Sequence, residues 1–301
     1  MILVTGGTGF IGRHVVARLV EGGEKVRVAS RGSRKATLPA SVEQVTADVG
    51  SGEGLPEAMA GVDEVVHLVA VITEKGAQRF DAVIRGGTAN IVSEAEKAGV
   101  KKLVYVSAIG AAPDPKYPYW HAKWQAEQAV TAGGVNWTIL RSSLVFGPED
   151  DFFNRLDRLI RRMPVAPVAG NGKTRFQPIW VEDVVSCVVA CLKEGVHDRE
   201  IVEIGGSEYY TYNEIIDLIR RKIGTRKPKL HVPLWVMRPA ARVLQAILPS
   251  PPVTTDQLAM LAKDNVTALD AVPKAFGFTA TSFREALFYV PEPPRDGTGP
   301  R

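Results

Sequence analysis

The sequence predicts an α/β fold with a doubly wound parallel sheet and a smaller C-terminal domain. Three observations lead to this expectation. Strand-like runs rich in Val and Ile alternate with helical patterns over the first half, as in parallel sheets covered by helices on both faces. A glycine-rich turn follows the first of these runs. After Gly147-Pro148 the alternation changes, and a chain of 301 residues is long enough for two domains.

The first half contains six expected strands and four expected helices. The strands are Ile2–Thr5, Lys25–Ser30, Val42–Ala47, Glu64–Val71, Lys102–Ser107 and Trp137–Arg141. The helices are Ile11–Glu21, Leu55–Met59, Gly86–Ala98 and Pro118–Ala132. Gly99 and Gly133-Gly134 stand where two of the helices should end, because glycine readily adopts the backbone conformation of a helix C-terminus. We therefore expect the parallel sheet to occupy residues 1–147.

The second half is expected to be mainly helical. A strand turning into a helix is expected over residues 176–193 and a further strand over Ile201–Ile204, so residues from about 176 to 204 would return to the first domain. Helices are expected over Phe152–Arg162, Thr211–Ile223, Leu234–Leu248, Asp256–Lys263 and Ser282–Tyr289. We assign residues 148–290 to the smaller domain. The Pro- and Gly-rich tail over 291–301 is expected to be disordered.

Composition excludes several classes of protein. The net charge of +4 is mild and forms no block of like charge, so nucleic acid is not an expected partner, although anionic small molecules are compatible with it. Cys187 and Cys191 have poor spacing for zinc and are interpreted as core residues, so no metal site is expected. The longest apolar run contains His67 and is too short to span a bilayer. Because a strand begins at Ile2, no signal peptide is expected, and a cytoplasmic location is predicted.

The glycine-rich turn has the spacing of a dinucleotide-binding loop. Residues 5–12 read Thr-Gly-Gly-Thr-Gly-Phe-Ile-Gly, and Gly6, Gly9 and Gly12 are spaced three apart. The first two glycines permit a tight turn close to a pyrophosphate, and Gly12 lets the helix pack against the strand. Free N–H groups at the helix start, over Phe10 and Ile11, would face the negative charge. The sequence therefore predicts a Rossmann domain that binds a nicotinamide dinucleotide.

The end of the second strand indicates which dinucleotide is bound. NAD sites usually place a carboxylate there to hold the ribose 2′-OH, whereas this chain has Ser30 followed by Arg31, Arg34 and Lys35. Cations without a carboxylate would attract a 2′-phosphate. We therefore expect NADP rather than NAD, the alternative being a solvated basic loop.

Two further strand ends complete the expected cofactor site. Asp48, followed by Val49, ends the third strand and is placed to hydrogen-bond the adenine amino group. The segment Leu68, Val69 and Ala70 follows the fourth strand and is expected beside the nicotinamide ribose.

A tyrosine and a lysine form the candidate catalytic pair. Tyr119 and Lys123 are four residues apart on an expected helix, which places phenol and ammonium on one face. A free tyrosine has a pKa near 10. A neighbouring ammonium and an oxidised nicotinamide would favour phenolate and lower that pKa, so that Tyr119 could exchange a proton with a carbonyl or alcohol.

These pieces together resemble the short-chain dehydrogenase/reductase superfamily in its extended or atypical branch. The sequence looks most like the NAD-dependent epimerase/dehydratase type, and in particular the relatives of the nucleotide-binding accessory subunit of respiratory complex I. The matching segments are 5–12, 48–49, 65–70, 87–90, 105–108, Tyr119 with Lys123, 140–141, 147–148, 179–184, 204–206 and 253–265.

The resemblance implies roles for individual residues. Tyr119 would be the acid/base, Lys123 would bind the nicotinamide ribose, and Ser107 at the end of the fifth strand would hydrogen-bond the reacting oxygen. Two features depart from the pattern. Ala108 stands where sugar epimerases often carry the working hydroxyl, and Ile84 stands where relatives often carry asparagine. Both weaken the case for turnover more than the case for cofactor binding.

Substrate features are less specific than cofactor features. Arg175 stands where sugar-nucleotide enzymes often place a diphosphate-binding arginine, and the alternative is a surface charge or an ion pair with Glu182 or Asp183. The segment Leu234–Leu248 resembles an interfacial membrane helix, although a lid helix packing its apolar face on the second domain is the favoured interpretation.

Two hypotheses about function follow. The leading one is an NADP(H)-dependent oxidoreductase or epimerase acting on a carbonyl or hydroxyl of a small, possibly nucleotide-linked, substrate. The competing one is a non-catalytic protein that binds NADPH for structure, assembly or sensing. A monomer or a homodimer is compatible with either.

Overall fold

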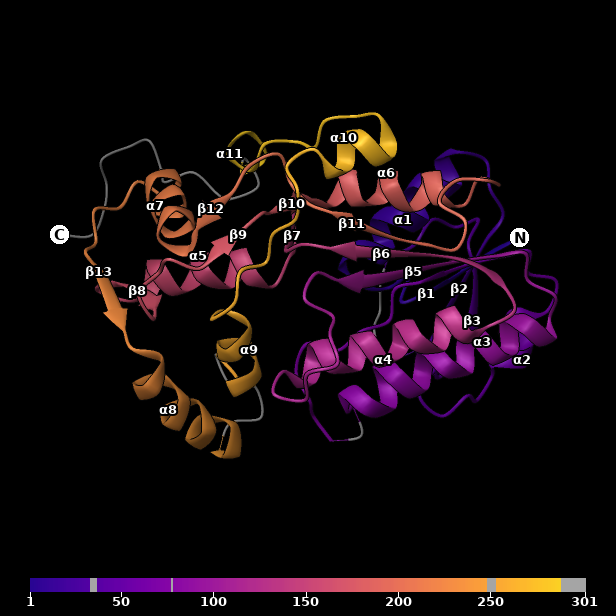
Figure 1. The fold of residues 1–301 in the computed structure, drawn as a ribbon, viewed down its shortest axis with the longest axis horizontal. Coiled ribbons are helices and arrows are strands. Elements are labelled where there is room, and N and C mark those ends of the chain that lie inside the picture. Colours follow the sequence, from indigo (N-terminus) through magenta and orange to yellow (C-terminus); the bar gives the residue numbers. More distant parts are fainter. Residues whose placement is uncertain (33–36, 77, 248–252, 288–301) are drawn as a thin grey trace. The chain divides into compact units, whose positions relative to one another are not determined.

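The structure is a computed structural model that describes residues 1–32, 37–76, 78–247 and 253–287 (Figure 1). The chain divides into two compact units. The first contains residues 1–142, 181–204 and 271–278, and the second contains 143–180, 205–270 and the residues from 279 onward. Arg34, Lys35 and the predicted tail over 291–301 lie outside the described residues.

The first unit is built on a seven-stranded parallel sheet. Its strands are β1 (Ile2–Thr5), β2 (Val26–Ser30), β3 (Glu43–Thr46), β4 (Glu64–His67), β5 (Lys102–Ala108), β6 (Asn136–Ser142) and β11 (Glu200–Ile204). Their order across the sheet is β11-β6-β5-β4-β1-β2-β3. Successive strands run outward from β1 on one side and from β4 on the other, which confirms the predicted doubly wound α/β fold.

Helices cover both faces of this sheet. They are α1 (Phe10–Glu21), α2 (Leu55–Met59), η1 (Phe80–Gly86), α3 (Gly87–Lys97), α4 (Pro118–Ala132), α6 (Val181–Cys191) and α10 (Ala271–Phe276). Figure 1 shows α1 and α6 on one face of the sheet and α2, α3 and α4 on the other. The inner strands β1, β4 and β5 are apolar and almost wholly buried, as the Val- and Ile-rich runs predict. The edge strands β3 and β11 are more exposed. Cys187 and Cys191 are buried free thiols in α6, as expected of core residues.

Three features of the first unit differ from the expectations. A π-helical turn, η1, precedes α3, so the helix begins at Phe80 rather than near Gly86; Phe80 and Ile84 bury their side chains against the core. Strand β4 ends at His67 instead of continuing to Val71, because the pairing of β4 with β1 stops at the end of β1. Helix α10 was not expected.

The second unit has three two-stranded sheets and five helices among its described residues. The strands are β7 (Val145–Phe146), β8 (Ala166–Ala169), β9 (Arg175–Phe176), β10 (Ile179–Trp180), β12 (Tyr210–Thr211) and β13 (Lys229–Val232). The helices are α5 (Phe152–Arg162), α7 (Tyr212–Lys222), α8 (Leu234–Ile247), α9 (Thr255–Met260) and α11 (Phe283–Ala286). The pairs are β10 with β7, β12 with β9 and β13 with β8.

An aromatic cluster forms the centre of the second unit. The rings of Phe146 and Phe153 each lie 4.9 Å from that of Phe283, measured between centroids. All three side chains are almost completely buried. Clustered aromatic rings supply much apolar contact area per residue, which suits a unit with so little regular sheet.

No helix in the described part of the chain is long and apolar enough to cross a membrane. Within the same residues, no group of three or more His, Cys, Asp or Glu side chains is arranged to hold a metal ion.

Candidate functional site

The glycine-rich turn follows β1 and leads into α1. Gly6 has φ +79°, a left-handed conformation that favours glycine, and the N–H of Gly9 donates to the carbonyl of Gly6 at 2.9 Å. A Cβ built on Gly12 would lie 2.1 Å from the Gly6 carbonyl oxygen and 2.7 Å from the Cα of Gly7. A Cβ at Gly6 or Gly12 would therefore require a change of the backbone, whereas a Cβ on Gly9 would lie 3.1 Å from the Gly6 carbonyl oxygen.

The start of α1 is open to an anion. Gly9 is the N-cap residue and provides no side-chain cap, and the first turn, which begins with Phe10 and Ile11, contains no acidic residue. The unpaired N–H groups of such a turn and the helix dipole together attract negative charge. The turn also lies where strand order reverses, between β1 and β4, which is the usual ligand position in open α/β sheets. This cradle fits the pyrophosphate of a dinucleotide.

Residues 68–70 follow β4 next to the glycine-rich turn. The N–H of Leu68 donates to the carbonyl of Thr5 at 3.0 Å, and a Cβ on Gly6 would lie 3.0 Å from the Leu68 carbonyl carbon. Leu68 and Val69 are partly buried, whereas Ala70 is exposed. The two segments are therefore in contact, as the expected cofactor site requires.

The ends of β2 and β3 carry the side chains expected at the adenosine end. Ser30 is partly buried, Arg31 is exposed, and the hydroxyl of Ser30 accepts a hydrogen bond from the N–H of Gly32 at 3.3 Å. Asp48 accepts the N–H of Gly50 at 2.8 Å through one carboxylate oxygen.

Val49 is buried behind Asp48, and Asn90 donates to the Val49 carbonyl at 2.8 Å. A residue of α3 therefore fixes the backbone at the end of β3.

Tyr119, Lys123 and Glu127 follow one another at four-residue intervals along α4. Tyr119 is partly buried and its ring packs edge-on against Phe80 at 5.8 Å. The ammonium of Lys123 donates to the Val106 carbonyl of β5 at 2.9 Å. Residues four apart share a face of a helix, so this face of α4 is turned toward β5.

Burial sets the protonation of the tyrosine–lysine pair. It raises the pKa of Tyr119 to about 12, so the phenol is neutral at ordinary pH. It lowers the pKa of Lys123 to about 8, an effect that the negative charge of Glu127 partly opposes. The sequence-based expectation is a Tyr119 pKa lowered by Lys123 together with an oxidised nicotinamide; in the protein alone, burial raises that pKa instead.

Ser107 lies at the end of β5 as expected, but its hydroxyl is engaged. It donates to the carboxylate of Glu127 at 2.6 Å. Arg141 of β6 donates to both oxygens of the same carboxylate, at 2.9 and 2.6 Å. Ser107 and Glu127 are fully buried, so three neighbouring elements meet at one carboxylate. In this arrangement the only hydroxyl proton of Ser107 is directed at Glu127.

The buried His67, at the end of β4, contacts both β1 and α3 through its two ring nitrogens. The Nδ1 atom of His67 lies 2.6 Å from the Thr5 hydroxyl, and its Nε2 atom lies 3.1 Å from the Thr88 hydroxyl. Thr88 donates its own proton to the Ile84 carbonyl at 2.6 Å, so it accepts from Nε2–H. Burial, with a contribution from the charge of Lys123, lowers the pKa of His67 to about 3. The ring is therefore neutral.

Arg175 lies in the second unit and is paired with an acid distant in sequence. Its guanidinium donates to Asp264 at 2.7 Å, and its own backbone N–H donates to the other oxygen of that carboxylate at 2.8 Å. These bonds hold the pKa of Asp264 below its ordinary value. The ion pair of Arg175 is therefore with Asp264 and not, as the alternative had it, with Glu182 or Asp183.

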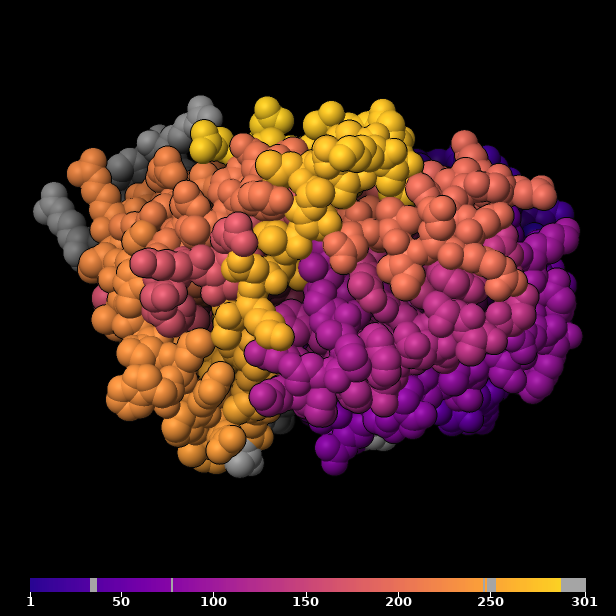
Figure 2. Space-filling view, viewed as in Figure 1, coloured from indigo at the N-terminus to yellow at the C-terminus, as the bar shows by residue number. Residues whose placement is uncertain are grey.

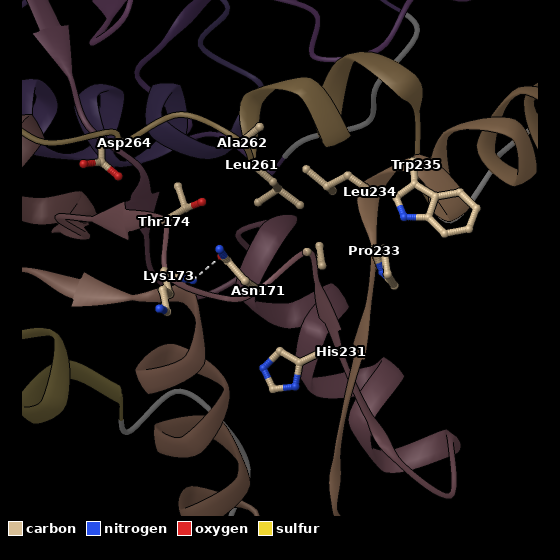
Figure 3. Close-up of a pocket in the computed structure, with 12 residues that line it drawn as sticks. Asn171, Lys173, Thr174, His231, Pro233, Leu234, Trp235, Leu261, Ala262 and Asp264 are labelled. Carbon is tan, nitrogen blue, oxygen red and sulfur yellow. Dashed lines mark hydrogen bonds between the residues drawn. The ribbon is translucent and has the colours of Figure 1, made fainter.

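An open cavity of about 820 Å³ lies beside Asp264 in the second unit (Figure 3). Its polar side is formed by Asn171, Lys173, Thr174 and Asp264 (Figure 3). Leu234, Trp235, Leu261 and Ala262 form the apolar side (Figure 3). Such a lining suits a ligand that has both polar and apolar parts.

Sequence reasoning missed Glu127, Arg141 and His67 as members of the polar network. Glu127 lies four residues after Lys123, just as Lys123 lies four residues after Tyr119. The sequence itself therefore indicates that Glu127 shares their face of the helix. Arg141 and His67 have no such signal, because their partners come from different strands and helices.

The fold and the glycine-rich turn define a protein of the dinucleotide-binding α/β class. The sequence profile of the NAD dependent epimerase/dehydratase family matches residues 2–205, which is more than half of the chain. The chain therefore belongs to the NAD dependent epimerase/dehydratase family, as its resemblance predicts.

The chain is similar to proteins of several activities. It is 29% identical to the mitochondrial NADH dehydrogenase [ubiquinone] 1 alpha subcomplex subunit 9 of Arabidopsis thaliana, over 89% of this chain and 71% of that protein. It is 30% identical to a ceramide reductase of Caulobacter vibrioides, over 76% of this chain and 72% of that protein. Its fold matches that of a UDP-glucose 4-epimerase of Thermotoga maritima with a TM-score of 0.75 and 23% identity, over 96% of both chains.

Proposed function

We propose that this protein is an NADP(H)-dependent oxidoreductase or epimerase that acts on a carbonyl or hydroxyl group of a small substrate. Membership of a nicotinamide-dinucleotide-dependent family supports the cofactor class, and relatives named as a reductase and as epimerases support the reaction class. The observation that carries the proposal is the face of α4. Tyr119 and Lys123 share it, in the same unit as the open glycine-rich turn.

The proposed reduction needs one hydride and one proton. A bound nicotinamide dinucleotide would supply the hydride to the carbonyl carbon. Tyr119 would donate the proton to the carbonyl oxygen, and its pKa of about 12 keeps that proton in place at neutral pH. In the reverse direction Tyr119 would accept the hydroxyl proton, which the positive charge of Lys123 and of an oxidised nicotinamide favours.

Lys123 would hold the nicotinamide ribose in this proposal. Its ammonium already lies against β5 through Val106, and its centre is 4.8 Å from the centroid of the Tyr105 ring. Both contacts place the charge under the carboxyl end of the sheet, on the side of α4 that also carries Tyr119.

NADP preference rests on the end of β2. Ser30 stands where a carboxylate would repel a 2′-phosphate, and Arg31 is exposed there. We expect tighter binding of NADPH than of NADH, and Arg31→Ala should narrow the difference. Equal affinities of the unaltered protein in a fluorescence titration would contradict this preference.

Arg175 is the residue proposed to recognise the substrate. The relatives include proteins named for a nucleotide sugar and for ceramide, which share a reacting hydroxyl or carbonyl but differ in the rest. Arg175 remains the proposed anion contact for a nucleotide-linked substrate, although such a substrate would have to compete with Asp264 for its guanidinium.

A non-catalytic NADPH-binding role is the second candidate. Ser107 directs its hydroxyl at Glu127, and the following residue, Ala108, offers no hydroxyl. A relative is named as a subunit of NADH dehydrogenase, so a role in an assembly is also represented among similar proteins. The oligomeric state, monomer or homodimer, stays a prediction.

Replacement of Tyr119 by Phe separates the two candidates. The protein would be assayed with NADPH against a panel of ketones, aldehydes and nucleotide sugars, with Tyr117→Phe as the matched control two residues away. We expect Tyr119→Phe to lower turnover by a factor of about 100 or more while NADPH binding is retained. Normal NADPH binding without any turnover that depends on Tyr119 would favour the non-catalytic role.

A further inference from the structure

Helix α8 carries two apolar stripes. The inner stripe contains Ala241, which is buried, and Leu234, Met237 and Leu244, which are partly buried. The outer stripe contains Trp235, Val243 and Ile247, which at 3.6 residues per turn lie on one side of the helix, within about a third of its circumference. One apolar face is enough to pack α8 against its own unit, and the outer stripe is a second apolar face.

The outer stripe is exposed to an extent that is unusual for large apolar side chains. Trp235 is 76% exposed, Ile247 71% and Val243 57%. Val236, on the same side of the helix, is 42% exposed. Large apolar side chains exposed together on one side of a helix indicate a contact with another molecule or with a membrane. The predicted lid helix thus accounts for the inner stripe only. Figure 2 shows part of this segment, in orange, at the surface.

The charged residues of α8 itself have one sign. Arg238 and Arg242 are both exposed and stand four residues apart beside the stripe, and α8 contains no acidic residue. Residues 218–255 contain eight Lys or Arg and no Asp or Glu. A surface of this composition is complementary to an anionic one.

The arrangement has the properties of an interfacial helix. Apolar residues with a tryptophan form one face, and arginines flank it, so that their stems can lie along the apolar layer while the guanidinium groups reach phosphates. Tryptophan prefers the boundary between hydrocarbon and headgroups. We propose that α8 docks on an anionic phospholipid bilayer through Trp235, Val243 and Ile247, with Arg238 and Arg242 contacting lipid phosphates.

The cavity of the second unit adjoins this surface. Leu234 and Trp235, the first residues of α8, also line its apolar side. Docking of α8 would thus bring the apolar side of the cavity to the lipid surface. The proposal does not depend on the proposed enzymatic function.

Vesicle flotation tests the proposal on the full chain. The vesicles would contain phosphatidylcholine alone, or equal parts of phosphatidylcholine and phosphatidylglycerol. We expect flotation with the anionic vesicles, weakened by high salt, and little with the neutral ones. The double variant Trp235→Gln with Ile247→Gln should bind at least about tenfold more weakly, since two large apolar side chains no longer enter the lipid.

Arg238→Gln combined with Arg242→Gln should also weaken binding by about tenfold or more, because each basic residue near an anionic surface contributes to its attraction. Ile72→Gln is the matched control, since Ile72 is 51% exposed and lies in the first unit. It should bind as the unaltered protein does.

A fluorescence measurement tests the proposal independently of the glutamine variants, which could fail to fold. Vesicles should shift the tryptophan emission of the unaltered protein to the blue, and Trp235→Phe, which keeps the apolar surface, should float normally but lose most of that shift. Absence of flotation with anionic vesicles, or unchanged flotation of the Trp235→Gln, Ile247→Gln variant, would overturn the proposal. So would a lipid-independent dimer that this variant dissociates, because the stripe would then bind a second copy.

Discussion

The glycine-rich turn of the first unit and the Arg175–Asp264 pair of the second are two ways of building a site. In the turn, residues 6–12 contact one another. A Cβ built on Gly12 would lie only 2.1 Å from the Gly6 carbonyl oxygen, so the backbone requires glycine at that position. The pair instead joins two residues 89 apart in sequence, through exposed side chains.

The comparison shows that a steric requirement of the backbone can be recognised in a sequence more readily than a polar pair between residues far apart in the chain. Only glycine satisfies the turn, whereas many residue pairs could connect the ends of β9 and the segment after α9. The predictions that follow use this contrast, and they are ordered from the largest expected effect to the smallest.

Gly12→Ala should have the largest effect. Its Cβ would overlap the Gly6 carbonyl, so the turn must open and the cradle for the pyrophosphate is lost. We expect NADPH affinity to fall by a factor of about 100 or more, measured by fluorescence titration. Gly134→Ala is the matched control, because its nearest neighbour would be 3.6 Å away. Similar NADPH affinities of the Gly12→Ala and Gly134→Ala variants would contradict the steric explanation.

Glu127→Gln should lower the free energy of unfolding by about 3 kcal/mol, because it leaves the Arg141 guanidinium without its buried counter-charge. Chemical denaturation measures this change. In the control, Asp81→Asn removes an exposed pair with Arg85 and should change stability by less than about 1 kcal/mol. If both variants lost the same stability, burial of the carboxylate would not be the cause.

The buried His67 should make stability depend on pH. The folded ring stays neutral down to about pH 3, whereas the unfolded ring takes up a proton near its ordinary pKa of 6.5. The unfolded state therefore binds more protons in this window, and stability falls as the pH is lowered. Between about pH 7 and pH 5 this ring alone should cost about 2 kcal/mol. His67→Gln should remove that part of the dependence, and an unchanged pH dependence in this variant would contradict the assignment.

Asp264→Asn should have the smallest effect, no more than about 1 kcal/mol, since both partners of its pair with Arg175 are substantially exposed. The pKa of Asp264 is lowered in the folded state, so its contribution is present at neutral pH and is lost as the pH falls through that pKa. Denaturation of both proteins at neutral and acidic pH checks this. A loss of several kcal/mol would mean that the second unit depends on this pair as the first depends on Glu127.

Much of the first unit could be predicted from sequence, because its elements are long and regularly patterned. The bounds of β1, α2 and α4 agree with the expectation, and so do those of α5 in the second unit. The hydrophobic period and the flanking Pro or Gly residues suffice for such elements.

Other features needed the structure because their causes are not local. The π-helical turn η1 depends on how Phe80 and Ile84 pack against distant strands. The parallel pairing of β8 with β13 joins segments more than 60 residues apart. The engagement of Ser107 by Glu127 likewise follows from the packing of α4 on β5, which no spacing along β5 reveals.

Isothermal titration of the full chain with NADPH and with NADH tests the central claim most directly, which is that the turn between β1 and α1 binds a nicotinamide dinucleotide. We predict saturable binding of one molecule per chain, tighter for NADPH and lost in Gly12→Ala. A folded protein that binds neither nucleotide would contradict this claim. So would a Gly12→Ala variant that binds the nucleotides as tightly as the unaltered protein does.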